Sequence, residues 1–353
     1  MTLSHSYYLV KNMKYSFEND YSEGTHPKIL EALVKTNLEQ TVGYGLDDYC
    51  LQATNALKKK VNNNNIDVHF LPNGTGTNAL VIDTILKRYQ AVIACDSGHI
   101  NVHETGAVES TGHKVLTRPH INGKLNVKMI ESILNEHPDE HMVMPSMVYI
   151  SQPTEYGTVY SLEELKDIYN YCKQHNLYLY IDGARLASAL CVEGAPSLKD
   201  LVNYSDVFYI GGTKNGALMG ECLVIVNDEL KNDFRYQIKN HGLMMAKGRI
   251  LGIQFLELFK DNLYEEIGKH QTDMAQYMAK QLRELNVQFY LESPTNQLFI
   301  ILSNELIEKL HQDYNFMIFQ PIDDNNSCAR LVTSFNTQKS DVDGFISTFK
   351  KYM

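Results

Sequence analysis

Lys214 is the residue of this chain whose type and setting most favour chemistry. It follows Thr213 and the pair Gly211-Gly212, directly after an apolar run that ends at Ile210. A lysine at the end of a buried strand is poorly placed to be a solubilising group. Out of bulk water the pKa of its amine falls, so the amine becomes nucleophilic towards an aldehyde. Lys214 is therefore a candidate for covalent chemistry, although a lone lysine is usually a surface residue.

An aspartate follows another apolar run upstream of this lysine. Asp182 comes directly after the residues YLYI and precedes Gly183-Ala184-Arg185. An acid at the carboxyl end of a strand points into the ligand cleft of an open α/β sheet. Such a carboxylate can keep a pyridine nitrogen protonated, which makes the ring an electron sink for a carbanion. Without a ligand of this kind, Asp182 is explained as the N-cap of a helix.

A glycine-rich loop at residues 73–78, NGTGTN, could hold an anion. Gly74 and Gly76 let the backbone come close to an anion, and the helix expected after them supplies free N–H groups and the positive end of its dipole. The loop lacks the full GxGxxG and GxxxxGK[ST] patterns, which disfavours a dinucleotide or a nucleoside triphosphate. Gly74, Thr75 and Gly76 form either a phosphate cup or a plain glycine-rich turn.

His99 follows a further strand, in the segment Cys95-Asp96-Ser97-Gly98-His99. Its imidazole could stack on a planar ring or act as a base, whereas a lone histidine is more often structural. Taken together, the phosphate cup, the acid for a ring nitrogen and the strand-end lysine describe one ligand. Pyridoxal phosphate has the phosphate, the pyridine nitrogen and the aldehyde that these groups would bind, so it is the cofactor that the sequence predicts.

Alternating strands and helices must position these residues. We expect strands at residues 66–71, 91–95, 146–151, 176–182, 205–212 and 221–227, and helices at 77–89, 126–137 and 161–175. The last of these helices opens with a capping box, Ser161 and Glu164. This alternation indicates a mainly parallel, doubly wound α/β sheet, which binds its ligands at the carboxyl ends of the strands.

The pattern changes after about residue 230. We expect helices at residues 230–241, 249–260, 264–286, 304–313 and 340–352, and strands at 287–291, 296–302 and 328–335. This arrangement predicts an N-terminal arm with a large cofactor-binding domain at residues 1–250. It also predicts a smaller α+β domain at residues 251–353.

The composition favours small-molecule chemistry. The 353 residues are 44% hydrophobic and 21% charged, enough for a large core, and the net charge of −10 disfavours a nucleic-acid-binding face. The six cysteines have no CxxC spacing, so we expect no metal site built on thiolates. We find no signal-peptide pattern and no membrane-spanning apolar run. We therefore expect a cytoplasmic protein that binds neither nucleic acid nor membrane.

These motifs resemble those of the threonine aldolase/β-eliminating lyase family, whose members are pyridoxal-phosphate enzymes of the aspartate-aminotransferase-like fold (fold type I). The resemblance runs from about residue 17 to about residue 335. PNGTGTN resembles PSGTxxN, DSGHI resembles the family's AHI segment, IDGAR resembles HLDGAR, and GTKNGALMG resembles SKGLGAPVG. The resemblance implies that Lys214, beside Thr213, bonds to the cofactor, that Asp182 contacts the pyridine nitrogen and that His99 stacks on the ring.

The resemblance also implies residues for the substrate. ENDYSEG resembles the family's RSDTVT segment, which places Asn19 near the substrate carboxylate. IDGAR places Arg185 there, and CARLVTSF resembles the C-terminal arginine segment, which makes Arg330 a second carboxylate clamp. VGYGLDD resembles VYGEDP, whose tyrosine reaches a neighbouring subunit's site, so Tyr44 implies a homodimer or homotetramer with shared sites.

Three segments depart from the family pattern. The family's ENTHN reads QPTEY at residues 152–156, which puts Glu155 where the family has a histidine. Its GGGMRQ reads GLMMAKGR, so Lys247 or Arg249 would replace the arginine that binds phosphate. The histidine that contacts the substrate hydroxyl has no counterpart in register, since His141 lies one position away.

The sequence predicts a low-specificity L-threonine aldolase, a lyase that cleaves β-hydroxy-α-amino acids to glycine and an aldehyde. Lys214, Asp182 and His99 are the expected catalytic residues, with His99 or an ordered water as the base. The alternatives with the same cofactor are a β-eliminating lyase, a racemase or an aminotransferase. A catalytically idle protein of this fold is disfavoured by the presence of Lys214, and a nicotinamide oxidoreductase by the absence of GxGxxG.

Overall fold

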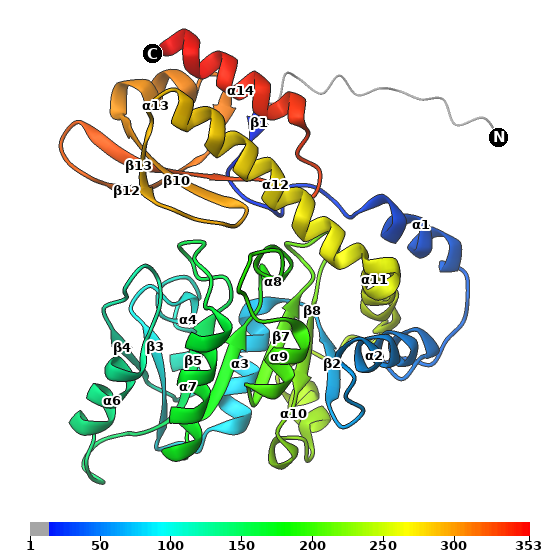
Figure 1. Ribbon diagram of the computed structural model, residues 1–353. Helices are drawn as coiled ribbons and strands as arrows, with labels where there is room; N and C mark the ends of the chain where they lie inside the picture. The colour runs from blue at the N-terminus through cyan, green and yellow to red at the C-terminus, as the bar shows by residue number, and fades with distance from the viewer. Residues whose placement is uncertain (1–13) are drawn as a thin grey trace.

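The computed structural model describes residues 14–353, and the first 13 residues of the predicted N-terminal arm lie outside this range. A seven-stranded sheet forms the centre of the larger region, in the order β2-β8-β7-β6-β5-β3-β4 (Figure 1). Its strands are β2 (Asp67–Leu71), β3 (Gln90–Cys95), β4 (Val115–Arg118), β5 (Met144–Ser151), β6 (Tyr178–Asp182), β7 (Val207–Gly211) and β8 (Glu221–Ile225). Six of these strands occur where the sequence predicts them, and the short edge strand β4 is the addition.

The sheet is parallel from β4 through β7, whereas β8 runs antiparallel to both of its neighbours. The reversal has a simple cause. Only residues 212–220 connect β7 to β8, and a parallel pair needs a crossover of roughly a dozen residues or more. The turn that carries Lys214 is therefore a tight connection between two neighbouring strands, which holds the lysine close to the sheet.

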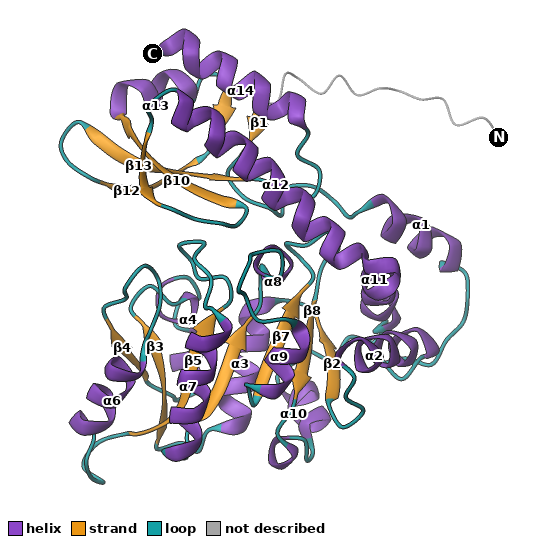
Figure 2. Cartoon of the chain, viewed as in Figure 1, coloured by secondary structure: helices purple, strands orange, loops and turns teal. Residues whose placement is uncertain are grey.

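Helices cover both faces of this sheet (Figure 2). They are α3 (Gly74–Ile85), α4 (His99–Val102), α5 (Ala107–Ser110), α6 (Val127–Glu136), α7 (Leu162–Gln174), α8 (Leu186–Ala189), α9 (Leu198–Asn203) and α10 (Phe234–Asn240), with the 3₁₀ turn η1 (Asp228–Leu230). Successive strand residues enter different cores, since Ile93 belongs to one cluster and Val92 to the other. The predicted capping box opens α7, with both reciprocal bonds between Ser161 and Glu164 present. The doubly wound α/β class is thus confirmed.

The C-terminal region has its own antiparallel sheet, in the order β12-β13-β10-β9. The elements here are β9 (Gln288–Leu291), β10 (Gln297–Ser303), β12 (Met317–Pro321), β13 (Asn326–Val332), α12 (Leu263–Glu284), α13 (Asn304–Leu310) and α14 (Lys339–Tyr352), with β1 (Tyr15–Ser16) paired to β11 (Tyr314–Asn315). Phe17, next to β1, lies fully buried in this core, so the start of the described chain is fixed to its far end. The long helix α12 packs against α8 at one end and against α14 and β10 at the other, which connects the two sheets.

Three further helices lie beyond the β2 edge of the large sheet: α1 (Pro27–Thr36), α2 (Asp48–Val61) and α11 (Arg249–Phe259), which is followed by the 3₁₀ turn η2 (Lys260–Asn262). α11 packs against both α1 and α2. Contact with α2 is close, because a Cβ on Gly252 would lie 2.5 Å from the Sγ atom of Cys50. Within residues 14–353, no helix is long and apolar enough to cross a membrane.

Candidate active site

A cavity of about 320 Å³ opens where the strands of the large sheet end. Loops after β2, β3, β5, β6 and β7 line it, and we call it the strand-end pocket. Seven residues that the sequence singles out line this pocket together: Gly74, Thr75, His99, Asp182, Arg185, Thr213 and Lys214. The shared position follows from the topology, because the carboxyl ends of parallel strands meet at one edge of the sheet.

The N-terminus of α3 forms one wall of the strand-end pocket. Asn73 caps this helix, and its side chain accepts a hydrogen bond of 2.7 Å from the backbone N–H of Gly76. Gly74 and Thr75 line the pocket, so the first turn of the helix faces it. Gly76 does not line it, and a Cβ there would lie 2.7 Å from the Cδ2 atom of Leu243. The second glycine of the loop thus allows close packing of α3.

Asp182 is held by donors on both of its oxygens. The hydroxyl of Tyr149 donates to Oδ2 at 2.6 Å, and the hydroxyl of Tyr209 donates to Oδ1 at 2.5 Å. The backbone N–H of Ala184 donates to Oδ1 at 2.9 Å. Burial alone would raise the pKa of Asp182, but His99 and the two tyrosine hydroxyls together hold that pKa below its ordinary value. The carboxylate therefore stays charged in a buried position.

Lys214 and Glu221 lie in the same part of the pocket. Burial lowers the pKa of the Lys214 amine, and the nearby Arg185 lowers it further. Glu221, the first residue of β8, accepts hydrogen bonds of 3.0 Å from the backbone N–H of Gly212 and from the hydroxyl of Thr213. Burial raises the pKa of Glu221 to about 7. Sequence reasoning missed Glu221, although an acid at the start of an otherwise apolar strand was the available signal.

His99 forms hydrogen bonds with two further acids of the pocket, Glu104 and Glu155. Its Nδ1 atom lies 2.7 Å from Oε1 of the buried Glu104. The amide of Asn78 donates to the same Oε1 at 2.7 Å and to Asp182 at 3.2 Å, so Glu104 and Asp182 are neighbours at the bottom of the pocket. The backbone N–H of His99 donates to Oε1 of Glu155 at 2.9 Å. Neither Glu104 nor Glu155 was among the predicted site residues.

Two arginines lie near each other at this site: Arg185 follows β6 of the large sheet and lines the pocket, whereas Arg330 lies on the smaller sheet and does not line it. Arg185 is already paired with Asp20, with Nε 2.7 Å from Oδ2 and Nη2 3.1 Å from Oδ1. Arg330, on β13, donates from Nη2 to the backbone carbonyl of Glu18 at 3.4 Å, while its Nε is buried without a hydrogen-bond partner. Burial lowers the pKa of Arg330 to about 10, and the charge of Arg185 adds to this shift. Two guanidinium groups thus lie near one carboxylate, an arrangement suited to a second anion.

Asn19 and His141 lie outside the strand-end pocket. The side chain of Asn19 accepts hydrogen bonds of 2.9 Å from the backbone N–H of Tyr21 and the hydroxyl of Ser22, while its neighbour Asp20 is the residue that contacts Arg185. His141 is exposed on the loop before β5. Among residues 14–353, no group of three or more His, Cys, Asp or Glu side chains is placed to hold a metal ion.

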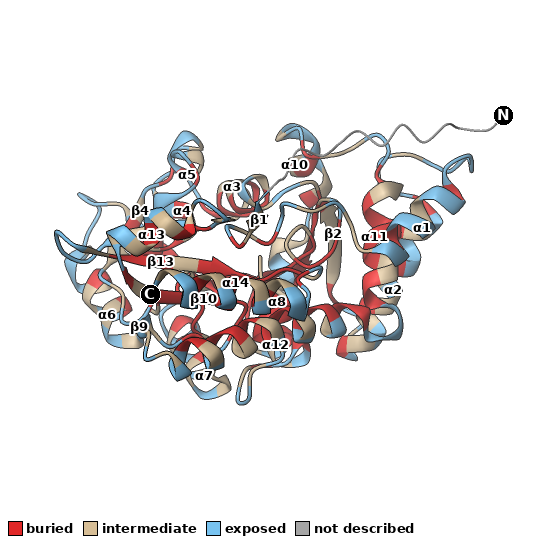
Figure 3. Ribbon diagram, turned by 90° about the horizontal axis from the view of Figure 1, so that it is seen from above, coloured by how far each residue is buried: buried red, intermediate tan, exposed pale blue. Residues whose placement is uncertain are grey.

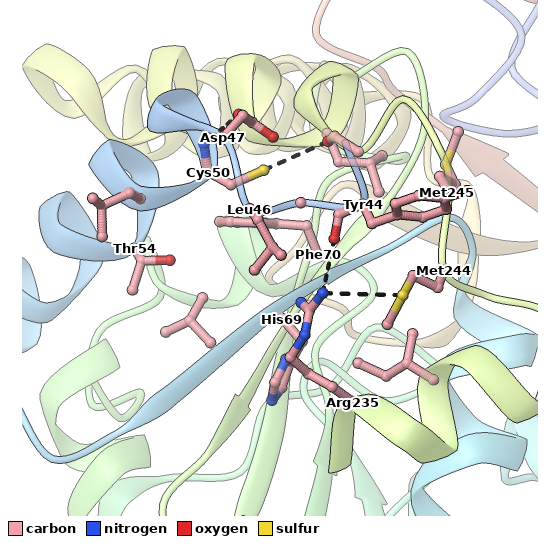
Figure 4. Close-up of a pocket in the computed structure, with 16 residues that line it drawn as sticks. Tyr44, Leu46, Asp47, Cys50, Thr54, His69, Phe70, Arg235, Met244 and Met245 are labelled. Carbon is pink, nitrogen blue, oxygen red and sulfur yellow. Dashed lines mark hydrogen bonds between the residues drawn. The ribbon is translucent and has the colours of Figure 1, made fainter. Parts of the chain in front are cut away.

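Tyr44 lines a different cavity, of about 260 Å³, between α2, β2 and α10 (Figure 4). Its backbone carbonyl accepts a hydrogen bond of 3.0 Å from Arg235, and its ring lies under the amine of Lys239 at 4.8 Å. Lys247 and Arg249 are also outside the strand-end pocket. Arg249 instead donates to the backbone carbonyls of Thr36 and Glu39.

Comparison with known proteins identifies the family. A family model described as beta-eliminating lyase matches residues 20–305. The chain belongs to the beta-eliminating lyase family. This family member is 31% identical to the low specificity L-threonine aldolase of Pseudomonas aeruginosa, over 91% of this chain and 93% of that protein. It is 30% identical to the enzyme of the same name from a Pseudomonas species, over 92% and 94% of the two chains.

Solved structures agree with this family assignment. A structure of the threonine aldolase of Leishmania major superposes with a TM-score of 0.94 and 46% identity, over 96% of this family member and 99% of that chain. An aromatic aminotransferase of Pyrococcus horikoshii, with 14% identity and a TM-score of 0.70 over 96% and 95% of the two chains, shows the same fold. The predicted fold type I architecture and a pyridoxal-phosphate-dependent lyase as the enzyme class are confirmed.

Proposed function

We propose that this lyase is a low-specificity L-threonine aldolase that cleaves β-hydroxy-α-amino acids to glycine and an aldehyde. The observation that carries the proposal is the strand-end pocket, in which Lys214, Asp182, His99 and Arg185 lie together, with the guanidinium group of Arg330 near that of Arg185. The two Pseudomonas relatives that bear this name match more than nine tenths of the chain, which supports the same activity here.

The residues of the pocket fit pyridoxal phosphate. When bound, the cofactor supplies an aldehyde for amines and a protonated ring that takes up an electron pair. A lysine with a lowered pKa suits the aldehyde, and an aspartate that stays charged suits the ring nitrogen. The capped start of α3, at Gly74 and Thr75, offers backbone N–H groups and a dipole end to the phosphate. Thr213, through Glu221, fixes the turn that carries Lys214.

The arginines would hold and orient the substrate. In this proposal the carboxylate of the amino acid binds Arg330, whose Nε lacks a partner, with Arg185 beside it. Asp20 keeps Arg185 in place, and Asn296 donates to Asp20 at 3.0 Å. A carboxylate held by a planar guanidinium has one favoured orientation. That orientation decides which bond at Cα lies perpendicular to the cofactor ring, and aldol cleavage needs the Cα–Cβ bond there.

Covalent attachment of the cofactor tests the assignment of Lys214. Borohydride reduction of the cofactor-loaded protein, followed by peptide mapping, should place a pyridoxyl group on Lys214. Lys173, a partly buried lysine that is paired with Asp206, should remain unmodified. A label on any other lysine, or no label after incubation with pyridoxal phosphate, would remove the central element of the proposed site.

Product analysis tests the activity itself. The loaded protein should convert L-threonine, L-allo-threonine and other β-hydroxy-α-amino acids to glycine and the matching aldehyde. Lys214→Ala should lose this activity. Formation of a 2-oxo acid and ammonia in place of glycine would instead assign a β-eliminating reaction, which uses the same cofactor and the same pocket.

We also propose a two-fold homodimer, or a homotetramer, in the cytoplasm. Tyr44 lies outside the strand-end pocket of its own chain, which supports a role in a neighbouring subunit's site. All six cysteines are free, which supports a reducing compartment. Within each chain, we keep the predicted division at residue 250 as a proposal, although α11 still packs against α1 and α2 and the chain reaches the smaller sheet through α12.

A further inference from the structure

One carboxyl oxygen in the strand-end pocket is buried without a partner. Oε1 of Glu155 accepts hydrogen bonds from the backbone N–H of His99 at 2.9 Å and from the hydroxyl of Ser151 at 2.7 Å. These two donors fix the direction of the side chain. Oε2 is shielded from solvent and makes no hydrogen bond. A buried polar atom of this kind costs free energy unless a ligand or water supplies its partner, so Oε2 is placed to accept a hydrogen bond from a bound hydroxyl or amine.

The surroundings of Glu155 place it beside the reacting bond of the substrate. Glu155, Arg185 and Asp182 line the same cavity, so Glu155 lies near both the carboxylate clamp and the acid for the ring nitrogen. The Cα atom of a bound amino acid must lie between those two groups, because the carboxylate and the ring are on either side of it, and Cβ is then one bond away. We propose that Glu155 is the base that accepts the β-hydroxyl proton of the substrate, an assignment that rests on the aldolase activity proposed above.

Glu104 is the other acid of the pocket with a buried, unpartnered oxygen, but its position differs. Its Oε1 is bound to His99 Nδ1 and to Asn78, and Asn78 also contacts Asp182. Glu104 therefore belongs to the group under the ring nitrogen. His99 is also less suited to be the base. An imidazole that stacks on the cofactor presents its face to the ring, and its nitrogen atoms then lie at the edge.

The electrostatic surroundings of Glu155 make it a stronger base than an exposed glutamate. Burial raises the pKa of Glu155, and the charge of Asp182 raises it further, whereas the Ser151 hydrogen bond and His99 oppose the shift. The other titratable groups that face it are Arg185, and Tyr149, Tyr160 and Cys95, whose own pKa values are raised. A carboxylate with a raised pKa is a stronger base than an exposed glutamate.

The proton transfer balances without any further reactant. The β O–H bond breaks and its proton passes to Oε2 of Glu155. The Cα–Cβ bond breaks as the C=O bond of the aldehyde forms, and the electron pair stays with Cα, stabilised by the bound cofactor. Cα then takes up one proton to give glycine, so the hydroxyl has lost one proton and Cα has gained one.

Glu155→Gln is the variant that tests this assignment, because glutamine keeps the shape and can still accept the two hydrogen bonds at Oε1. We expect kcat for L-threonine to fall by about 100- to 10,000-fold, the usual contribution of a general base. The rise of kcat/KM with pH that titration of Glu155 produces should disappear. Exchange of the glycine α-proton in D₂O needs no base at a β-oxygen and should persist. Glu193→Gln, at an exposed position, is the matched control. It should leave kcat, the pH dependence of kcat/KM and the exchange of the glycine α-proton unchanged.

A second readout needs neither cofactor nor activity. Infrared difference spectra of the cofactor-free protein, recorded from acid to alkaline pH, should contain one titrating carboxyl band in the wild type that is lost in Glu155→Gln, while the band of Glu221 stays in both. Glu155→Asp, which keeps the acid, should retain the pH dependence at a reduced rate. Wild-type kcat and an unchanged pH profile in Glu155→Gln would overturn the assignment, as would equal loss of glycine exchange and cleavage. If the wild type itself yields no glycine, the proposed function fails instead.

Discussion

Glu221 and Lys214 share a buried site that disfavours both of their charges. The pKa of the lysine is lowered, chiefly by burial, and the pKa of the acid is raised to about 7 for the same reason. Burial thus shifts the two pKa values towards each other. Because Glu221 also binds Gly212 and Thr213, any change in its charge acts directly on the turn that presents the lysine.

The raised pKa of Glu221 makes the stability of the cofactor-free protein pH-dependent. A group with a raised folded-state pKa contributes stability below its unfolded value, and this contribution is lost as the pH rises through the folded value. Relative to Glu221→Gln, the wild type should lose up to about 3 kcal/mol in its free energy of unfolding between pH 4.5 and pH 7. Urea unfolding across this range measures the difference. The prediction fails if the difference in the free energy of unfolding between wild type and Glu221→Gln stays constant across this range. Glu284→Gln, at an exposed position, is the control for which a constant difference is expected.

Arg330 is expected to act on the substrate and not on the cofactor. Arg330→Lys keeps the charge but removes the planar fork that grips a carboxylate. Hydrogen bonds to charged groups contribute about 1.5–3 kcal/mol, so kcat/KM should fall by about 10- to 100-fold. Absorbance of the bound cofactor should be unchanged, since Arg330 does not line the strand-end pocket. Near-normal kinetics in both Arg330→Lys and Arg330→Ala would show that the substrate carboxylate binds elsewhere.

At the scale of elements, the contact between α8 and α12 connects the pocket to the smaller sheet. α8 begins directly after Arg185, and α12 presents Gly268 to it. A Cβ on Gly268 would lie 2.1 Å from the backbone oxygen of Ala187. Since backbone atoms cannot move aside as a side-chain tip can, the two helices touch here only because this residue has no side chain.

Gly268→Ala should therefore destabilise the protein, although alanine is the better helix former. Glycine costs a helix about 1 kcal/mol relative to alanine, and a clash of this kind costs about 1–3 kcal/mol, so the net effect should be a loss of up to about 2 kcal/mol. Displacement of α8 should also raise KM by shifting Arg185. Thermal and urea unfolding measure the loss. Gly344→Ala in α14 is the control, because only the movable hydroxyl of Tyr314 lies close to it, and equal effects of the two substitutions would contradict the prediction.

The elements that carry the site could be predicted because each leaves a local signature. Asp182 and Lys214 both follow apolar strands, and strand ends converge for topological reasons. Glu221, Glu104 and Asp20 could not be assigned in the same way, since their roles depend on contacts with Thr213, His99 and Arg185 that are distant in the chain or set by a turn. At position 76 the need for glycine has a packing reason that the sequence did not show, because a Cβ there would meet Leu243, and contact of its backbone with phosphate stays a prediction. β4 is short and only half-buried, so it lacks a clear strand pattern.

At the scale of the whole molecule, the surface around α1 and the loop to α2 exposes more apolar side chains than is usual for a monomer. Leu38 is 92% exposed and Val34 is 70% exposed. Several further apolar side chains of the same segment are exposed: Leu30, Val42, Leu46 and Leu51. Pale blue exposed stretches along α1 mark this face in Figure 3. Large exposed apolar patches are typical of interaction sites, and a second copy of the chain is the simplest symmetric partner.

Tyr44 lies in the loop of this apolar surface and is the residue expected to act in a neighbouring subunit's site. Its backbone has a φ of 60°, which a bulky residue rarely adopts, and the carbonyl of Ala246 and the guanidinium of Arg235 hold it there. Backbone strain of this kind clusters at active sites and ligand-binding segments. We therefore predict that the protein sediments as a dimer or larger oligomer. The double substitution Val34→Glu and Leu38→Glu should reduce both the fraction of oligomer and the catalytic activity.

Mixing two inactive variants distinguishes a shared site from a separate one. Lys214→Ala removes the proposed cofactor lysine, and Tyr44→Ala removes the side chain expected to enter the neighbouring site. If Tyr44 acts across the interface, a mixed dimer contains one site with both residues intact and one site with neither.

Random mixing in equal amounts should then restore roughly a quarter of the wild-type activity, since half of the dimers are mixed and each has one working site. If Tyr44 acts within its own chain, every site of the mixed dimer lacks one residue, and no activity returns. Unfolding and refolding the variants together before the assay ensures exchange of subunits, and wild type treated in the same way sets the full scale.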